Sequence, residues 1–191
     1  MANKAEIIKG LRRTHSRDLD VLVNSAATLS DDNTLTGLTD MPAGGFKSGD
    51  AKVLAAGAGQ LLTQADSGKT VIFGAAAATL IKLPAPELGM VFNFVTAITA
   101  TGDHEIQALT NAHGFLGGVS IVSTSVGESD AFSAAGAGTD DFITMNGSTK
   151  GGIAGSGLRI VAILDASAAK CWAVTGTLIG SGTLATPFAA S

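Results

Sequence analysis

The sequence has few of the side chains that carry chemistry. It contains no tyrosine, one tryptophan, one cysteine and three histidines in 191 residues, and only 15% of its residues are charged. Enzymes gather titratable groups with shifted pKa values in clefts, and this chain has few to gather. The single Cys171 excludes an internal disulfide framework and a zinc site built from several cysteines. The composition therefore favours a structural or assembly protein over an enzyme.

Long apolar runs are missing as well. No stretch of 18 or more apolar residues occurs, so the sequence predicts no membrane-spanning helix. Residues 1–10 lack the apolar core of a secretory signal, which predicts synthesis in a reducing, cytoplasmic compartment. Apolar residues still make up 46% of the chain, but many are alanines, which bury little area. We expect a modest core that gains stability from contacts between subunits.

Charge is divided unevenly along the chain. Residues 1–17 carry five basic residues and one acidic residue, a net charge of +4, and the remainder carries seven basic and fifteen acidic residues, a net charge of −8. A basic arm on an acidic body indicates a negatively charged partner, such as nucleic acid, an acidic protein surface or a neighbouring copy of the chain. Nucleic acid is the weaker candidate, because the arm has no interleaved aromatic residues for base stacking and the acidic body would repel DNA.

Residues 1–59 are interpreted as an extended arm. Within it, residues 3–13 predict a short basic helix, because apolar residues recur there at helical spacing. Two interpretations of this helix stay open: a solvated helix face, or a docking element whose apolar residues are buried while its arginines pair with carboxylates or phosphates. The candidate residues for binding a partner or a neighbouring subunit are Ile7, Ile8, Leu11, Arg12, Arg13 and Arg17.

Residues 60–191 show the pattern of an all-β domain. Short β-forming runs alternate with turn residues, which is typical of a sandwich or barrel. No long amphipathic helix follows any run, so we predict a mainly antiparallel sandwich or jelly-roll-like domain. The apolar run Ile160–Leu164 predicts a central strand buried on both faces. The residues expected in the core are Phe92, Phe94, Ile160, Ile163 and Trp172.

The segment Asp66–Thr70 ends like a phosphate-binding loop. The full motif needs a glycine where Thr63 stands, and a helix after the lysine whose N-terminus faces the anion. Here the β-forming run Val71–Phe73 follows, so we interpret the segment as a hairpin turn. The glycine clusters elsewhere are interpreted as loops, and no cofactor is predicted.

The histidines and the cysteine do not form a recognisable catalytic or metal-binding pattern. Asp103 and Glu105 flank His104, but in a strand they lie on the opposite face from it. A Ser-His-Asp triad is defined by geometry, yet the nucleophile-elbow pattern Gly-x-Ser-x-Gly does not occur. Cys171 lies beside Trp172 in an apolar run, which indicates a buried and inert thiol. We therefore predict no catalytic and no metal-binding residues.

Two stretches carry a more specific signal. The first is TQADSGK (residues 63–69) followed by LPAPELGMVFNF (residues 83–94), and the second is the Trp172 run followed by the closing Thr186-Pro187-Phe188. They resemble a pattern in virion proteins of tailed bacteriophages, over about residues 60–188 and without the arm. The resemblance implies a head decoration (cement) protein, which sits as a homotrimer on the capsid surface, binds the major capsid protein and stabilises the head without catalysis.

Other functions stay open beside this prediction. Within the structural class, the alternatives are a tail- or fibre-associated virion subunit and the shell-forming protein itself. From other classes, the alternatives are a host-facing carbohydrate-binding β-module and a hydrolase. Sugar sites commonly stack an exposed tryptophan or tyrosine on the ligand, and the lack of tyrosine weakens that alternative.

Overall fold

Short β-forming runs fold into strands that bury their apolar faces against one another. The computed structural model describes residues 51–191 apart from residues 55, 56, 126 and 137. Two short 3₁₀ helices, η2 (Gln64–Asp66) and η3 (Asn111–His113), lie among the strands. The strands are β1 (Ala51–Leu54), β2 (Gly57–Leu61), β3 (Thr70–Phe73), β4 (Thr79–Lys82), β5 (Val91–Thr96), β6 (His104–Gln107), β7 (Phe115–Ser123), β8 (Ser129–Ser133), β9 (Phe142–Met145), β10 (Gly157–Leu164), β11 (Lys170–Gly180) and β12 (Phe188–Ala189).

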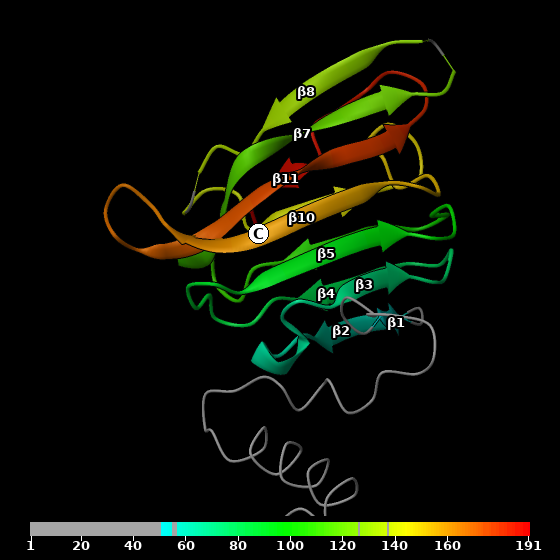
Figure 1. Cartoon of the computed structure of the whole chain (residues 1–191). Coiled ribbons are helices and arrows are strands. Elements are labelled where there is room, and N and C mark those ends of the chain that lie inside the picture. Colours follow the sequence, from blue (N-terminus) through cyan, green and yellow to red (C-terminus); the bar gives the residue numbers. More distant parts are fainter. Residues whose placement is uncertain (1–50, 55–56, 126, 137) are drawn as a thin grey trace, which may run out of the picture. The chain divides into compact units, whose positions relative to one another are not determined.

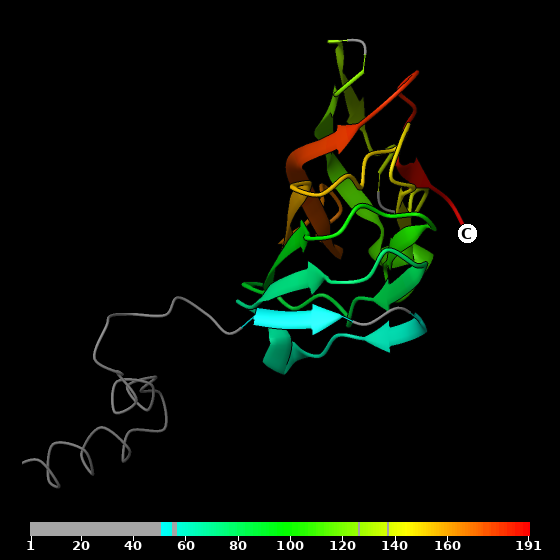
Figure 2. The ribbon, with the colours of Figure 1, turned by 90° about the vertical axis from the view of Figure 1, so that its right-hand side faces the viewer.

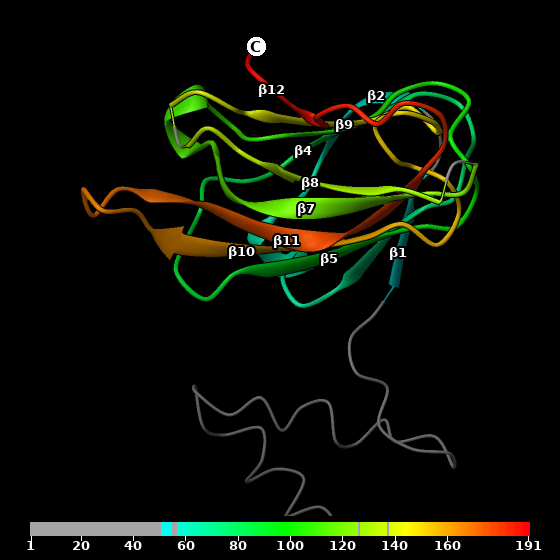
Figure 3. The ribbon, with the colours of Figure 1, turned by 90° about the horizontal axis from the view of Figure 1, so that it is seen from above.

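These strands form two sheets. The seven-stranded sheet has the order β1-β3-β5-β10-β11-β7-β8, and the five-stranded sheet has the order β12-β9-β6-β4-β2 (Figure 1). Seen from above, the two sheets are two layers that face each other (Figure 3). The prediction of an all-β, sandwich-like fold is confirmed. No helix among the described residues is long and apolar enough to cross a membrane.

The chain runs through β1–β6 by changing sheet at every strand. β1, β3 and β5 are parallel neighbours in one sheet, and β2, β4 and β6 are parallel neighbours in the other (Figure 2). A parallel neighbour requires a long crossover connection, and here a strand of the opposite sheet supplies it in place of a helix. The prediction of mainly antiparallel pairing is therefore wrong: of the ten pairs of described strands, five are parallel.

The second half of the domain closes the sandwich mainly with antiparallel pairs. β10 is antiparallel to both β5 and β11, β8 is antiparallel to β7, and β9 lies antiparallel between β6 and β12. The β7–β11 pair is parallel, with Phe115 opposite Trp172 at one end. Since β10 is the fourth of seven strands, it joins the β1–β6 half of the domain to the rest of the sheet.

The core lies between the two sheets and is built around aromatic side chains. Phe92, Phe94, Ile160 and Trp172 are buried, as predicted. Phe92 contacts Trp172 with their ring centroids 5.7 Å apart. The prediction for Ile163 is wrong, because it is only partly buried. Side chains alternate along a strand, so a residue three positions after Ile160 points to the outer face.

The strands begin earlier than the predicted domain boundary at residue 60. The compact unit runs Gly49–Ser191, and β1 and most of β2 lie within the segment interpreted as an arm. Their sequences, AKVL and GAGQL, contain few β-forming residues. They are strands because β3 and β4 offer edges to pair with, and pairing outweighs intrinsic preference. The helix predicted at residues 3–13 lies outside the described residues.

Candidate interaction surfaces

The residues predicted to bind a partner lie outside the part of the chain that the structure describes. These residues are Ile7, Ile8, Leu11, Arg12, Arg13 and Arg17. The structure therefore leaves the docking role of the arm as a prediction. The surfaces discussed below belong to the β domain.

The segment that resembles a phosphate-binding loop is an ion-paired turn. Asp66 accepts hydrogen bonds from Lys52 at 3.0 Å, from Lys69 at 3.1 Å and from the backbone N–H of Thr63 at 3.0 Å. Burial alone would raise the pKa of Asp66, but these hydrogen bonds together lower it well below its ordinary value of 3.8. Lys69, the lysine of this segment, pairs with Asp66, and so does Lys52 of β1. The segment is therefore a structural clamp that ties its own turn to β1. It links β2 to β3 in opposite sheets, so the predicted hairpin turn is wrong.

His104 is buried in the core rather than placed at a site. Its ring stacks on Phe73, and neither ring nitrogen has a hydrogen-bond partner of good geometry. Burial lowers the pKa of His104, while the nearby backbones of Ala75 and Ala77 and the charge of Asp103 act in the opposite direction. Asp103, just before β6, is exposed, and Glu105 within β6 is partly buried. Among the described residues, no three His, Cys, Asp or Glu side chains are grouped closely enough to hold a metal ion.

Cys171 and Trp172 are both buried, Trp172 in the core between the sheets and Cys171 on the other side of β11, opposite Ile163. Burial, together with the charge of Asp165, raises the pKa of the Cys171 thiol, which makes it a poor nucleophile. The buried indole of Trp172 does not present the flat face that a sugar needs for stacking. A carbohydrate site built on this tryptophan therefore does not fit the structure.

An apolar surface lies on the outer side of the seven-stranded sheet. In one row across this surface, Val91 of β5 is opposite Val161 of β10, which is opposite Ala173 of β11. In a second row, Ile72 of β3 is opposite Val95 of β5, whose side chain is 39% exposed. We call these five residues the valine face.

The valine face is unusual for the outer side of a sandwich. Such a surface is normally polar where water covers it. The outer side of the five-stranded sheet is mixed, because Lys82, Glu105 and Gln107 lie there beside Leu61, Leu80 and Phe142. Figure 3 shows no described strand lying over the outer side of the seven-stranded sheet. Large exposed apolar patches are typical of contact surfaces, so the valine face is a candidate contact surface.

A single cation lies between the two rows of the valine face. Arg159 of β10 is exposed and is flanked by Asn93 of β5 and Thr175 of β11. It forms no ion pair with any described residue, whereas Lys52, Lys69 and Lys170 each have a carboxylate partner. The surface thus combines apolar rows with one unpaired positive charge.

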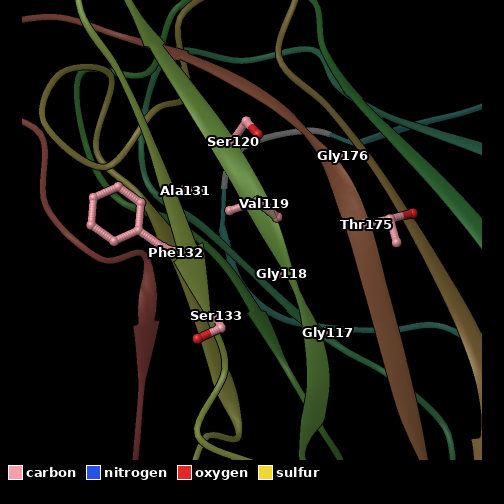
Figure 4. Close-up of a pocket in the computed structure, with 9 residues that line it drawn as sticks. All are labelled: Gly117, Gly118, Val119, Ser120, Ala131, Phe132, Ser133, Thr175 and Gly176. Carbon is pink, nitrogen blue, oxygen red and sulfur yellow. The ribbon is translucent and has the colours of Figure 1, made fainter.

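A hollow of about 570 Å³ continues the same sheet toward its β8 end (Figure 4). Its floor contains Gly117, Gly118 and Gly176. A Cβ atom on Gly117 would lie 2.5 Å from the carbonyl oxygen of Val174, and one on Gly118 would lie 2.6 Å from that of Phe132. The remaining lining residues are Val119, Ser120, Ala131, Phe132, Ser133 and Thr175. Because these glycines have no side chains, the backbones of the neighbouring strands approach closely here and no side chain fills the hollow from Gly117, Gly118 or Gly176.

The edge of the sheet beyond the hollow is acidic. Among the described strands, β8 pairs with β7 alone and leaves its other side as an edge of the sheet. Glu128, just before β8, and Asp130 within it are exposed. Neither carboxylate forms an ion pair with a described residue. Charged residues on an open edge oppose uncontrolled strand pairing, and they also offer a partner for a cation.

Sequence reasoning missed the valine face, although a signal for it was present. The run Ile160–Leu164 was interpreted as buried on both sides, but Val161 and Ile163 are only partly buried and Leu164 is exposed. The apolar residues Val91 and Val95 alternate with Phe92 and Phe94 in the same way. An apolar pattern on both faces of a strand indicates either burial or a contact surface, and the sequence does not separate the two.

A comparison with known protein families found no matching family, and comparisons with curated proteins and with solved structures found no match either.

Proposed function

We propose that this protein is a structural subunit of a tailed-bacteriophage virion, a head decoration protein that binds the major capsid protein on the capsid surface and stabilises the head as a homotrimer. In this proposal it acts by contact alone, without catalysis or a cofactor. A protein that binds only the assembled shell stabilises it by mass action. Several arms on one oligomer add avidity through their high effective concentration.

The valine face is the observation that carries the proposal. It gives the domain an apolar, uncovered contact surface, as an assembly subunit needs. The residues of the phage-like pattern give further support, because Leu83, Phe92, Phe94, Trp172 and Phe188 all lie in the core of the sandwich. The pattern therefore describes residues that build the domain. The basic arm, with Ile7, Ile8, Leu11 and its arginines, would supply a second contact to the shell.

The composition of purified virions tests this proposal. We expect the protein in the particles at a copy number proportional to that of the major capsid protein, and we expect imaging to place it on the outer surface of the head. A copy number typical of a tail component would instead assign it to the tail or its fibres. Absence from the particles would refute a virion role.

A truncated chain tests the arm separately. We expect a variant that lacks residues 1–26 to bind bare shells more weakly than the full chain in a co-sedimentation assay. Undiminished binding would show that the arm does not clamp the shell, while the decoration role of the β domain would stand.

A further inference from the structure

The valine face requires a cover of a particular chemistry. Its two rows are apolar, so a partner must bring apolar or neutral surface to them. Arg159 lies between the rows without an ion pair among the described residues. Covering a guanidinium without a partner costs far more than covering it with a carboxylate, so the partner must also bring a negative charge.

The chain itself carries a surface of that chemistry. Glu128 and Asp130 are exposed at the β8 edge and form no ion pair with a described residue; the same sheet has Arg159 near its middle. Ala131 and Ser133 present small neutral side chains at the rim of the glycine-floored hollow, whereas Asp130, opposite the buried Ile121, lies on the other side of β8. The β8 edge thus carries carboxylates at the border of a small, uncharged surface, and these two features match the cation and the uncharged rows of the valine face.

Charge also decides between the two ways in which copies could meet. A two-fold contact of the valine face with itself would bring Arg159 of one copy near Arg159 of the other, because β10 is the central strand. Like charges in such a contact disfavour it. A contact of the edge of one copy with the face of the next joins opposite charges. Such a head-to-tail contact builds a ring when its rotation closes after a whole number of copies, as in a trimer.

We propose that a second copy of this chain covers the valine face, with Glu128 and Asp130 of its β8 edge placed against Arg159. This inference rests on the proposed function, since it names the surfaces that hold the homotrimer together. Each copy contributes one face and one edge, so every interface in the ring is the same. The outer side of the five-stranded sheet and the arm stay free for the shell.

Charge reversal in the full chain tests the contact. The association of the purified protein is measured by sedimentation velocity over a range of concentrations. We expect the dissociation constants of the R159E variant and of the E128R/D130R variant each to be at least about tenfold higher than that of the unaltered chain, because like charges then meet. The triple variant R159E/E128R/D130R restores opposite charges at each interface, and we expect it to regain the oligomer.

Two further variants complete the design. K82E makes the same charge reversal on the outer side of the other sheet, where Lys82 is partly buried, and we expect it to associate like the unaltered chain. V95K places a charge within the valine face, and we expect it to dissociate the oligomer. Unfolding curves of each variant show that a loss of association is not a loss of the fold.

The outcomes separate the inference from the proposed function. An unaltered chain that stays monomeric at all concentrations would overturn the inference, as would an oligomer that R159E and V95K leave intact, or a triple variant that fails to reassociate. Monomers that nevertheless coat the head would leave the decoration role standing. An oligomer with the expected charge dependence that is absent from virions would leave the inference standing and refute the decoration role.

Discussion

The imidazole of His104 lies flat on the ring of Phe73, with centroids 4.6 Å apart and planes 8° from parallel. One ring comes from each sheet, so the stack crosses the middle of the sandwich. Placing a cation there would require its removal from water without a hydrogen-bond partner of good geometry. His104 is therefore neutral in the folded protein at neutral pH.

This stack predicts a pH dependence of stability. The pKa of His104 is lowered from its ordinary value of 6.5, so below pH 6.5 the unfolded chain binds a proton that the folded chain does not. The free energy of unfolding should fall as the pH drops from 6.5 toward the pKa of the folded state, with a slope of at most about 1.4 kcal/mol per pH unit.

The His104→Phe variant should remove this dependence. Phenylalanine keeps the stack on Phe73 and carries no proton, so we expect denaturant unfolding of the variant to be less sensitive to pH between 7.5 and 5. At pH 7.5 the variant should be at least as stable as the unaltered protein, because two buried nitrogens without hydrogen-bond partners of good geometry are gone. Equal pH dependence in both proteins would contradict this account.

The Asp66 turn predicts a different pH window and a measurable loss on mutation. The pKa of Asp66 is lowered below 3.8, so its contribution is present above that pH and is lost as the pH falls below it. At pH 7 we expect Asp66→Asn to lower the free energy of unfolding by about 1–3 kcal/mol, since Lys52 and Lys69 then lack their shared partner.

An exposed ion pair provides the control for Asp66. Lys170 pairs with Glu87, whose side chain is 53% exposed, and such pairs contribute little. We expect Glu87→Gln to change the free energy of unfolding by no more than about 0.5 kcal/mol. Similar losses in the two variants would mean that the three-residue clamp is no stronger than a surface pair.

The close approach of β10 and β11 predicts unequal effects at two neighbouring glycines. A Cβ atom on Gly176 would collide with the carbonyl oxygen of Gly157 and would lie 2.9 Å from the Cα of Leu158. We expect Gly176→Ala to destabilise the domain by about 1–3 kcal/mol. Gly157→Ala places its Cβ 3.7 Å from the carbonyl oxygen of Phe94, an ordinary contact, and should change stability by about 0.5 kcal/mol or less. Thermal unfolding of both variants checks the difference.

The buried thiol predicts low reactivity. Cys171 is fully buried and its pKa is raised, so little thiolate is present or accessible at neutral pH. We expect an aromatic disulfide reagent to modify it far more slowly in the native protein than in denaturant. It is the only cysteine of the chain, so the release of the reagent reports on this residue alone. Equal rates in the two conditions would show that the sandwich opens readily at this point.

Much of the β structure could be predicted from the sequence because alternation is a local signal. Phe92 and Phe94 were expected in the core, and both are buried. The partners of a strand are a non-local property, which explains why the parallel winding of β1–β6 was missed. β2 could not be recognised either, since its sequence GAGQL becomes a strand through pairing with β4. The two-residue β12 is too short to leave a pattern.

The candidate surface was harder to predict than the fold. Arg159 looks like an ordinary exposed residue in the sequence, and its position between two apolar rows depends on the registers of β5, β10 and β11. Ile163 is a second residue whose surroundings could not be predicted from the sequence. A period of two places it on the opposite face from Ile160, but only the structure shows that this face is uncovered.

The central place of β10 has a consequence for how the protein is made. During synthesis, β1, β3 and β5 emerge long before β10, and β7 and β8 emerge with no neighbour other than each other. The larger sheet thus exists as two separate fragments until the β10–β11 hairpin enters between them. If synthesis stops before residue 157, the truncated chain exposes unpaired strand edges at β5 and β7, and such edges are sites for aggregation.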